Sequence, residues 1–450
     1  MSLGHTAPRL LSRDVSAQKE CDHMEASKEY LLGPLDFSGT LSLGERSTPL
    51  DFQVSLSKTG DLDIVIPGLP VTKETRFILS TWPEKVCSTL FTLTGASADG
   101  RTITSDGMYL TSFNHSDVFK AAAKCTYAII TAKLKQPQTE HVVCYHLRAF
   151  QGFYELQQDT EFGRLHMTGQ KDIEDFNQIT GALTLVSSGT SFINEDKKTA
   201  ITVLLDHVLM IMSFAAGTYI RAPIRETYAN DSVETHVWRL SEGEQPFIAP
   251  MSHLNLDRIF GAAVSTYESF KNYKGLKAAI EWLLMPTTYN ELTFVKGMVA
   301  LEHLVAENKP PITNPFTEKQ RADLRNHVSA WLLINGLPED QASQIVGKLT
   351  NIGAPTLAAK ITAMLDEWKV PTGYLPPKAI KTVVDVRNKI VHSGIYYGKN
   401  QKTDVKLWTH ITVLYEMLTR IVLTLLNYSG PYYCHIDGYH VRMFPSCKPT

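Results

Sequence analysis

The sequence lacks the short motifs by which several large enzyme classes are recognised. It contains no glycine-rich fingerprint of a dinucleotide-binding fold, and Gly347-Lys348 lacks the upstream glycine that a phosphate-binding loop requires. It also contains no Gly-x-Ser-x-Gly elbow, the turn that presents the nucleophile of α/β-hydrolases. The sequence therefore gives no support to a dinucleotide-dependent enzyme, a P-loop nucleotidase or a serine hydrolase.

Cysteine is scarce, and its spacing forms no framework. The six cysteines are Cys21, Cys87, Cys125, Cys144, Cys434 and Cys447. Such scattered cysteines are typical of free thiols in a reducing cytosol. Cys434, His435, His440 and Cys447 carry donor atoms that zinc accepts, but no Cys-x-x-Cys pair anchors them. Cys125, Cys144 and His146 fit the interior of a sheet better than a ligand set. We therefore expect neither a metal nor a cofactor.

A long hydrophobic run and an excess of charge are also missing. The longest apolar stretch, Ile201 to Gly217, is interrupted by Asp206-His207 and is short for a membrane span. The amino terminus has no apolar segment followed by a cleavage site, so we expect no signal peptide. With 44 basic and 46 acidic side chains the net charge is -2, and no global field gathers nucleic acid. We expect a soluble, cytoplasmic protein with no membrane partner.

What the sequence does contain, after a polar extension over residues 1–27, is a β-rich region over residues 28–245. Apolar and polar residues alternate in Leu35–Leu43, Phe52–Leu56 and Leu62–Ile66, as in half-buried strands, and Lys58–Asp61 reads as a turn. Further strand candidates are Arg76–Leu79, Ser88–Thr94, Tyr127–Leu134 and His141–Ala149. Many short strands with Gly-, Asp- and Ser-rich turns predict an antiparallel sandwich or barrel-like domain.

The end of this region is less regular. An apolar helix is predicted over Thr199–Ala216, and strand-like runs follow over Tyr219–Thr227 and Val233–Leu240. These two runs either complete the first domain or form a connector. We place the domain boundary at the loop Ser241–Pro246.

From residue 251 to residue 430 the apolar period becomes helical and predicts an all-α bundle, so the fold class is α+β. The predicted helices are Leu256–Tyr273, Gly275–Leu284, Glu291–Ala306, Glu318–Ile334, Pro338–Leu349, Thr356–Trp368, Pro376–His392 and Thr403–Tyr428. In the remaining segment, 431–450, Asp437-Gly438 lies between β-favouring residues and predicts a hairpin that packs against one of the domains or a dimer partner.

The segment Val383–Gly394 is the strongest candidate for a functional site. Its valines and isoleucine recur at helical spacing, and Gly394 stands where a left-handed cap ends a helix. Arg387, Asn388 and His392 interrupt the apolar pattern near the helix C-terminus. An imidazole transfers protons near neutral pH, and a guanidinium holds phosphate oxygens with a fork of donors. Together they supply what cleavage of an RNA phosphodiester needs, because attack by the 2′-hydroxyl uses no bound metal.

The hexapeptide Arg387–His392 resembles the Arg-polar-x-x-x-His motif of the HEPN superfamily, and the whole chain resembles its ApeA-like branch, which acts in abortive-infection defence against phage. The resemblance implies a helical domain, a homodimer or higher homo-oligomer, and a metal-independent endoribonuclease with a composite cleft. It implies that RNA, such as a tRNA, is the substrate and that a phage component is the trigger. The β-rich domain then senses the trigger or the substrate.

The family's motif helix packs against an earlier helix with an Ala-Leu-Glu segment, which Ala300-Leu301-Glu302 matches. The resemblance therefore adds Glu302 to the site with Arg387, Asn388 and His392. Glu302 either orients Arg387 or His392 across the bundle, since a buried carboxylate needs a cationic partner, or is an exposed helix residue. Asn388 either positions His392 or a phosphate, or caps its own helix.

Basic and aromatic residues around the motif suggest where RNA binds. Lys389, Tyr396, Tyr397 and Lys399 combine charge for phosphates with rings that stack on unpaired bases. The alternative is that the two tyrosines cover the bundle core and the lysines form a solvated face. Arg325-Asn326-His327 has similar residues at the wrong separation, and we interpret it as helix surface.

Two other functional hypotheses stay open. The bundle is alternatively a non-catalytic RNA or nucleotide-binding sensor in which Arg387 and His392 hold phosphate without turnover. In a third, purely structural interpretation, the same two side chains only tie helices together.

Overall fold

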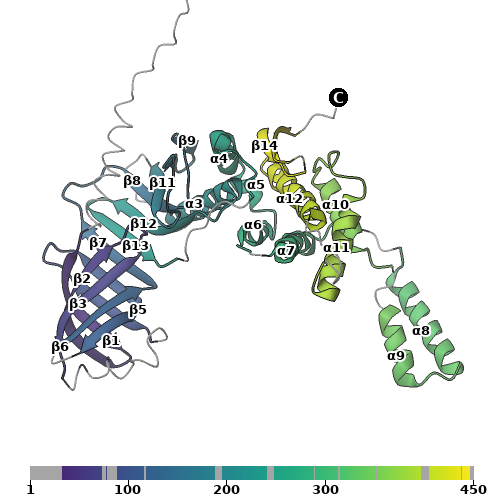
Figure 1. Ribbon diagram of the computed structural model, residues 1–450, viewed down its shortest axis with the longest axis horizontal. Coiled ribbons are helices and arrows are strands. Elements are labelled where there is room, and N and C mark those ends of the chain that lie inside the picture. The colour runs from purple at the N-terminus through teal and green to yellow at the C-terminus, as the bar shows by residue number, and fades with distance from the viewer. Residues whose placement is uncertain are drawn as a thin grey trace, which may run out of the picture. The chain divides into compact units, whose positions relative to one another are not determined.

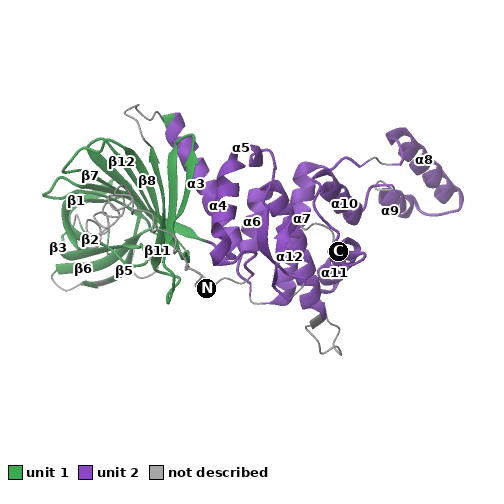
Figure 2. Cartoon of the chain, turned by 90° about the horizontal axis from the view of Figure 1, so that it is seen from above, with its two compact units in different colours: residues 1–195, 220–245 green, residues 196–219, 246–450 purple. Residues whose placement is uncertain are grey.

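The computed structural model describes residues 33–72, 75, 78, 89–115, 118–187, 195–240, 248–287, 289–312, 315–349, 353–396, 405–436 and 438–445 (Figure 1). The predicted extension over 1–27, most of the predicted strand Arg76–Leu79, and Tyr397, Lys399 and Asp437 lie outside the described residues. The chain divides into two compact units. The first comprises residues 1–195 and 220–245, and the second comprises 196–219 and 246–450 (Figure 2).

Six antiparallel strands of the first unit close into a barrel. They are β1 (Leu35–Leu43), β2 (Arg46–Leu56), β3 (Leu62–Pro70), β4 (Phe91–Ala96), β5 (Thr102–His115) and β6 (Val118–Cys125). Their order is β4-β1-β2-β3-β6-β5, and β4 also pairs with β5, which completes the ring. The predicted β-rich, barrel-like region is thus confirmed.

Alternation places the apolar side chains of the barrel strands inside. Phe37 on β1 and Phe52 on β2 are directly paired, and their rings stack with centroids 5.6 Å apart. Both are almost fully buried, because every second residue of a strand points to the same face. Gly39 lets β1 approach β4, since a Cβ there would lie 1.9 Å from the carbonyl oxygen of Thr94.

The sheet continues beyond the barrel through the next strand along the chain. β7 (Tyr127–Lys133) pairs on one edge with the start of β5, at residues 102–104, and on its other edge, along its whole length, with β13. The continuation has the order β7-β13-β12-β8-β11-β10-β9. Its other strands are β8 (His141–Arg148), β9 (Leu156–Thr160), β10 (Gly163–Gly169), β11 (Ile179–Ser187), β12 (Arg221–Ala229) and β13 (Ser232–Trp238). The runs predicted after residue 219 therefore complete the first unit and are not a connector.

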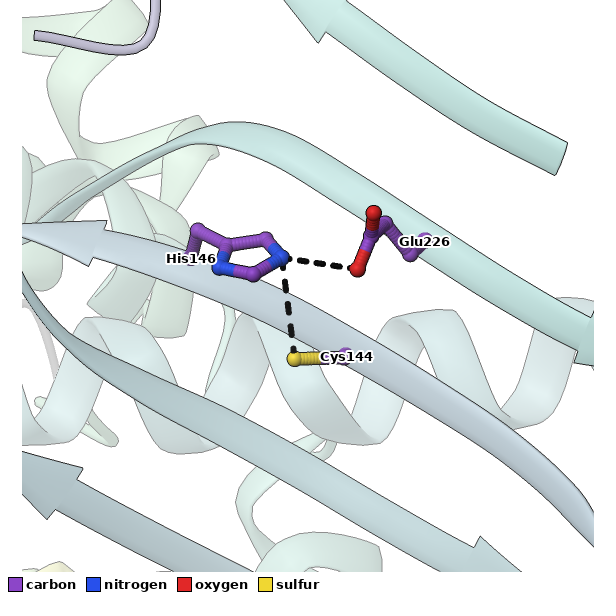
Figure 3. A group of neighbouring side chains, drawn as sticks. All are labelled: Cys144, His146 and Glu226. Atoms are coloured by element: carbon purple, nitrogen blue, oxygen red, sulfur yellow. Dashed lines mark hydrogen bonds and ion pairs between the residues drawn. The ribbon is translucent and has the colours of Figure 1, made fainter. Parts of the chain in front are cut away.

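A small group of polar side chains lies inside this continuation. Cys144 and His146 belong to β8, and Glu226 belongs to the neighbouring β12 (Figure 3). All three are buried. The expectation that Cys144 and His146 lie inside a sheet is confirmed.

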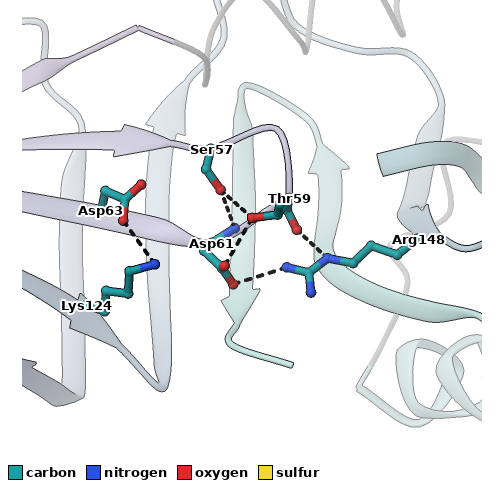
Figure 4. Close-up of polar contacts among 6 residues, drawn as sticks. All are labelled: Ser57, Thr59, Asp61, Asp63, Lys124 and Arg148. Carbon is teal, nitrogen blue, oxygen red and sulfur yellow. Dashed lines mark hydrogen bonds and ion pairs between the residues drawn. The ribbon is translucent and has the colours of Figure 1, made fainter. Parts of the chain in front are cut away.

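A buried arginine joins the barrel to the rest of the sheet. Arg148 at the end of β8 is 2% exposed, and it donates hydrogen bonds to the carbonyl oxygen of Thr59 and, at 3.1 Å, to Oδ1 of Asp61 (Figure 4). Thr59 and Asp61 belong to the turn between β2 and β3 that the sequence predicts. The turn closes on itself as well, because the Asp61 amide donates to Oγ of Ser57.

The second unit is built from helices and ends in a hairpin. The helices are α3 (Glu195–Ala216), η1 (His253–Asn255), α4 (Leu256–Ser265), α5 (Tyr267–Phe270), α6 (Leu276–Leu284), α7 (Asn290–Asn308), α8 (Glu318–Ile334), α9 (Glu339–Lys348), α10 (Leu357–Glu367), α11 (Ala379–Ser393) and α12 (Val405–Leu425). The hairpin strands are β14 (Gly430–Cys434) and β15 (His440–Phe444). The predicted helix Leu256–Tyr273 is broken at Thr266, where α4 ends and α5 begins.

The division into units differs from the predicted domains in the place of α3. The sequence groups this helix with the β-rich region, whereas it belongs to the second unit. The reason is its hydrogen bonding and packing: Nε2–H of His207 donates to the carbonyl oxygen of Ala263 on α4, and the Met251 amide donates to the carbonyl oxygen of Ala215. Among the described residues, α3 is the one helix long and apolar enough to cross a membrane. In its most apolar stretch of 18 residues, 56% is buried inside the protein.

The terminal hairpin is attached to α12 by a buried charge network. The guanidinium of Arg420 donates from Nε to Oε1 of Glu416 at 2.6 Å and from Nη2 to the Tyr432 hydroxyl at 2.7 Å. Glu416 also accepts the Tyr432 hydroxyl and the backbone amide of His435. Arg420 and Glu416 are 1% and 0% exposed. The hairpin therefore packs against its own unit, which is one of the two predicted arrangements.

Candidate active site

The helix that carries the Arg–His motif is anchored by the predicted apolar stripe. Val383, Val386 and Ile390 of α11 are buried, as their helical spacing requires. Val391, which was expected to widen this stripe, is 53% exposed. Its position is 100° from Ile390 around the helix, which turns it to the solvent side. The stripe is narrower than predicted, and the polar residues around it face outward.

Gly394 ends α11 as the sequence predicts. Its φ is 72°, in the left-handed region, and its amide donates to the carbonyl oxygen of Ile390 at 2.8 Å. A residue without a Cβ adopts this conformation at little cost, so the chain turns away immediately after His392. The cap leaves the last turn of the helix open to solvent.

Arg387 is fixed by a two-pronged ion pair with the earlier helix α7. Its Nε donates to Oε1 of Glu302 at 2.8 Å, and its Nη2 donates to Oε2 at 3.2 Å. The two side chains are 30% and 31% exposed. The neighbours Ala300 and Leu301 are fully buried, so the packing of α7 holds Glu302 at the rim of the bundle. A bidentate pair of this kind defines the plane of the guanidinium as well as its position.

Asn388 and His392 complete the outward-facing side of α11. Nη1 of Arg387 donates to Oδ1 of Asn388 at 3.3 Å. His392 is exposed and makes no hydrogen bond or ion pair within the described part of the chain. The structure brings Arg387, Glu302 and Asn388 together, and within the described residues no hydrogen bond or ion pair joins His392 to them.

Lys389 and Tyr396 form a second contact beside the motif. Nζ of Lys389 lies 4.6 Å from the centroid of the Tyr396 ring, within range of a cation–π interaction. The Tyr396 hydroxyl lies 3.2 Å from Nε2 of His410 on α12, and the two rings meet edge to face at 5.9 Å. Burial lowers the pKa of His410, which favours its neutral form. Sequence reasoning missed His410, because it is a lone histidine on another helix.

Arg325-Asn326-His327 lies on α8, apart from this cluster. A ring N–H of His327 donates to the carbonyl oxygen of Asp323 one turn earlier, and the side chain is exposed. The prediction that this trio is helix surface is confirmed. It provides a set of similar side chains outside the candidate site.

No protein-family model, no curated protein and no solved structure matches this chain.

Proposed function

We propose that this protein is a metal-independent endoribonuclease of the HEPN kind. The observation that supports it best is Arg387, held in one plane by Glu302 at the surface, five residues before the exposed His392 at a capped helix end. Arg387 stabilises the charge that develops on the scissile phosphate, and His392 transfers the proton of the 2′-hydroxyl or of the leaving oxygen. Glu302 and Asn388 position the guanidinium. The products are a 2′,3′-cyclic phosphate and a 5′-hydroxyl.

In this proposal, the site is composite and needs two copies of the chain. Five residues along a helix separate Arg387 and His392 by about 140° around the axis and roughly 7.5 Å along it. Arg387 is also directed toward α7 by Glu302, and within the described residues no hydrogen bond joins it to His392. A twofold arrangement of two α11 helices places the arginine of one chain beside the histidine of the other.

RNA in this proposal lies along the solvent side of α11 and the segment after it. The Lys389 ammonium covers one face of the Tyr396 ring, and Lys389 lies within the motif while Tyr396 follows it closely. Phosphates then meet Lys389, while an unpaired base stacks at Tyr396; Tyr397 and Lys399 extend the same surface by their place in the sequence. The substrate is single-stranded or loop RNA, such as a tRNA.

The wider role that we propose is abortive-infection defence against phage in the cytoplasm. The first unit, with its barrel and extended sheet, senses a phage component and keeps the nuclease quiet until that component arrives. The support for this assignment is the resemblance of the motif and of the domain order to the ApeA-like branch.

A second candidate function, a non-catalytic RNA or nucleotide sensor, is favoured by one observation. Glu302 already accepts two of the donor groups of Arg387, and Asn388 accepts a third. A guanidinium so engaged holds phosphate through fewer donors. RNA that binds and is never cut, with wild-type protein and phage lysate present, favours this function over the nuclease.

The test is cleavage of end-labelled RNA in EDTA, with phage lysate added to supply the proposed trigger, by wild type, His392→Ala, Arg387→Lys and Glu302→Gln. Loss of the proton-transfer group lowers the rate by about 10²–10⁴-fold, and the Lys variant loses about tenfold or more because it lacks the planar fork. Glu302→Gln gives a smaller decrease. The matched controls Arg325→Ala and His327→Ala retain wild-type rates. Equal cleavage by wild type and the His392→Ala variant would remove the proposed chemistry.

A further inference from the structure

Three donor atoms of different chemistry converge on one point in the sheet of the first unit. Sγ of Cys144 lies 4.0 Å from Nε2 of His146, and the same Nε2 lies 2.8 Å from Oε2 of Glu226 (Figure 3). All three atoms lie within 4.8 Å of one another. Cys144 and His146 are on the same face of β8, two residues apart, and Glu226 comes from β12, eighty residues later in the chain.

The geometry does not fit a catalytic cysteine triad. In such a triad one ring nitrogen of the histidine faces the thiol and the other faces the carboxylate, so that the ring passes a proton between them. Here Nε2 faces both Cys144 and Glu226. Their side chains are also buried, which closes the thiol to a substrate. One nitrogen, one sulfur and one oxygen around a common point form instead a set of metal ligands.

We propose that Cys144, His146 and Glu226 bind a divalent transition metal ion, with zinc as the preferred one. Thiolate, imidazole and carboxylate are the three ligand types of protein zinc sites. In a tetrahedral site with ordinary bond lengths, the ligand atoms lie roughly 3.3–3.6 Å apart. The observed 2.8 and 4.0 Å fall on either side of that range. Small side-chain rotations therefore bring all three atoms to bonding distance.

The surroundings are suited to hold the ligands in their metal-binding forms. Oγ1 of Thr184 on β11 donates to Sγ of Cys144 at 3.4 Å, which supports a negative sulfur. The Tyr228 hydroxyl donates to Oε2 of Glu226 at 2.9 Å. Partners of this kind orient ligands in metal sites. The fourth ligand is Tyr228 or a water molecule.

The burial of the ligands assigns the ion a structural role. β12 joins the sheet only after the chain has passed through α3, and an ion shared by β8 and β12 fixes that late pairing. Because folding encloses the site, the metal enters while the chain folds. The site belongs to the first unit and is independent of the Arg387–His392 motif, so either proposal stands without the other.

The test is the metal content of full-length protein produced in zinc-supplemented medium without a histidine tag. We expect about one zinc ion per chain, resistant to brief dialysis against EDTA and released on unfolding. Protein refolded with cobalt should show the intense near-ultraviolet absorption of a sulfur–cobalt bond. In the wild-type protein that absorption reports cobalt bound to a cysteine sulfur, and comparison with Cys144→Ser assigns it to Cys144.

Cys144→Ser removes the sulfur–cobalt absorption, and Glu226→Gln lowers the zinc content severalfold. Cys125→Ser is the matched control, since Cys125 is also a buried free cysteine of the first unit and lies outside the trio. It keeps both signals. Wild-type protein that carries no zinc after production in zinc and binds no cobalt on refolding would overturn the proposal, as would cobalt spectra unchanged by Cys144→Ser. The trio would then be a buried His146–Glu226 ion pair beside a thiol.

Discussion

At the scale of single residues, the buried histidines of the second unit are the groups most sensitive to pH. Desolvation lowers the pKa of His207 to about 4, with a smaller contribution of the same sign from Lys271. Burial also lowers the pKa of His435 to about 4. Both rings are neutral in the folded protein at neutral pH. His207 donates to Ala263 and packs its ring 4.8 Å from the centroid of Phe270, an arrangement that a proton would disturb.

Acid should therefore destabilise the second unit before most carboxylates titrate. Between pH 6.5 and pH 4 the unfolded chain binds a proton at each of these histidines and the folded chain does not, so stability decreases as the pH falls. A full shift of this size corresponds to about 3 kcal/mol per histidine. We expect His207→Gln, which keeps an N–H donor, to lose less stability than wild type between pH 7 and pH 4.5 in urea unfolding.

The control for this comparison is His327→Gln, on the exposed surface of α8. It should retain the wild-type pH dependence. If His207→Gln and wild type lose the same stability over this range, the assignment of a neutral, buried His207 is wrong.

Single residues were predicted correctly where the spacing in the sequence specifies which side of an element a side chain faces. The burial of Val383, Val386 and Ile390 follows from their spacing, and Gly394 caps the helix as its place in the pattern requires. The contact of Glu302 with Arg387 crosses two helices, and only the family resemblance linked these positions. Glu226 was not linked to Cys144 by any signal in the sequence, because register between distant strands is set by tertiary pairing.

At the scale of elements, α12 and the terminal hairpin depend on a fully buried ion pair. Truncating one partner of such a pair leaves the other as an uncompensated charge in a medium of low polarity. Glu416→Ala should therefore destabilise the second unit by about 3–5 kcal/mol, because Arg420, the Tyr432 hydroxyl and the His435 amide all lose their acceptor. The measurement is chemical unfolding followed by near-ultraviolet circular dichroism.

Replacing both charges should have a much smaller effect than replacing one. The double variant Glu416→Gln/Arg420→Met removes the charge pair and keeps similar volume, and we expect it to be more stable than Glu416→Ala. A Glu416→Ala protein as stable as wild type would show that the network does not hold the hairpin.

The strands and helices with strong periodicity were predicted well, and the misses have physical reasons. β1 and α8 have the predicted bounds, Leu35–Leu43 and Glu318–Ile334. β6 was missed because two of its four inward residues are alanines and its outward residues include Val118 and Ala122, so its apolar and polar positions contrast weakly. β5 was missed because a register shift between Leu110 and Ser112 breaks its alternation. β9, with the sequence LQQDT, has almost no apolar residues.

At the scale of the whole molecule, the chain combines a β-rich unit with a helical unit, as its change of apolar period predicts. The sequence groups α3 with the wrong unit, because an apolar helix between strands fits either one. Only its hydrogen bonds with Ala263 of α4 and with Met251 distinguish the two. Assembly between copies is likewise outside what periodicity can reveal. The proposed nuclease depends on that assembly, because in the proposal the arginine of one chain acts with the histidine of the other.

Complementation between two inactive variants tests the composite site most directly. In an Arg387→Ala/His392→Ala heterodimer, one pair keeps the arginine of one chain and the histidine of the other. After the two variants are unfolded and refolded together, we predict recovery of about a quarter of the wild-type RNA cleavage, because half of the dimers are mixed and each retains one of two sites. Each variant refolded alone should stay inactive. A mixture with no more activity than the separate variants would contradict a site shared between two copies.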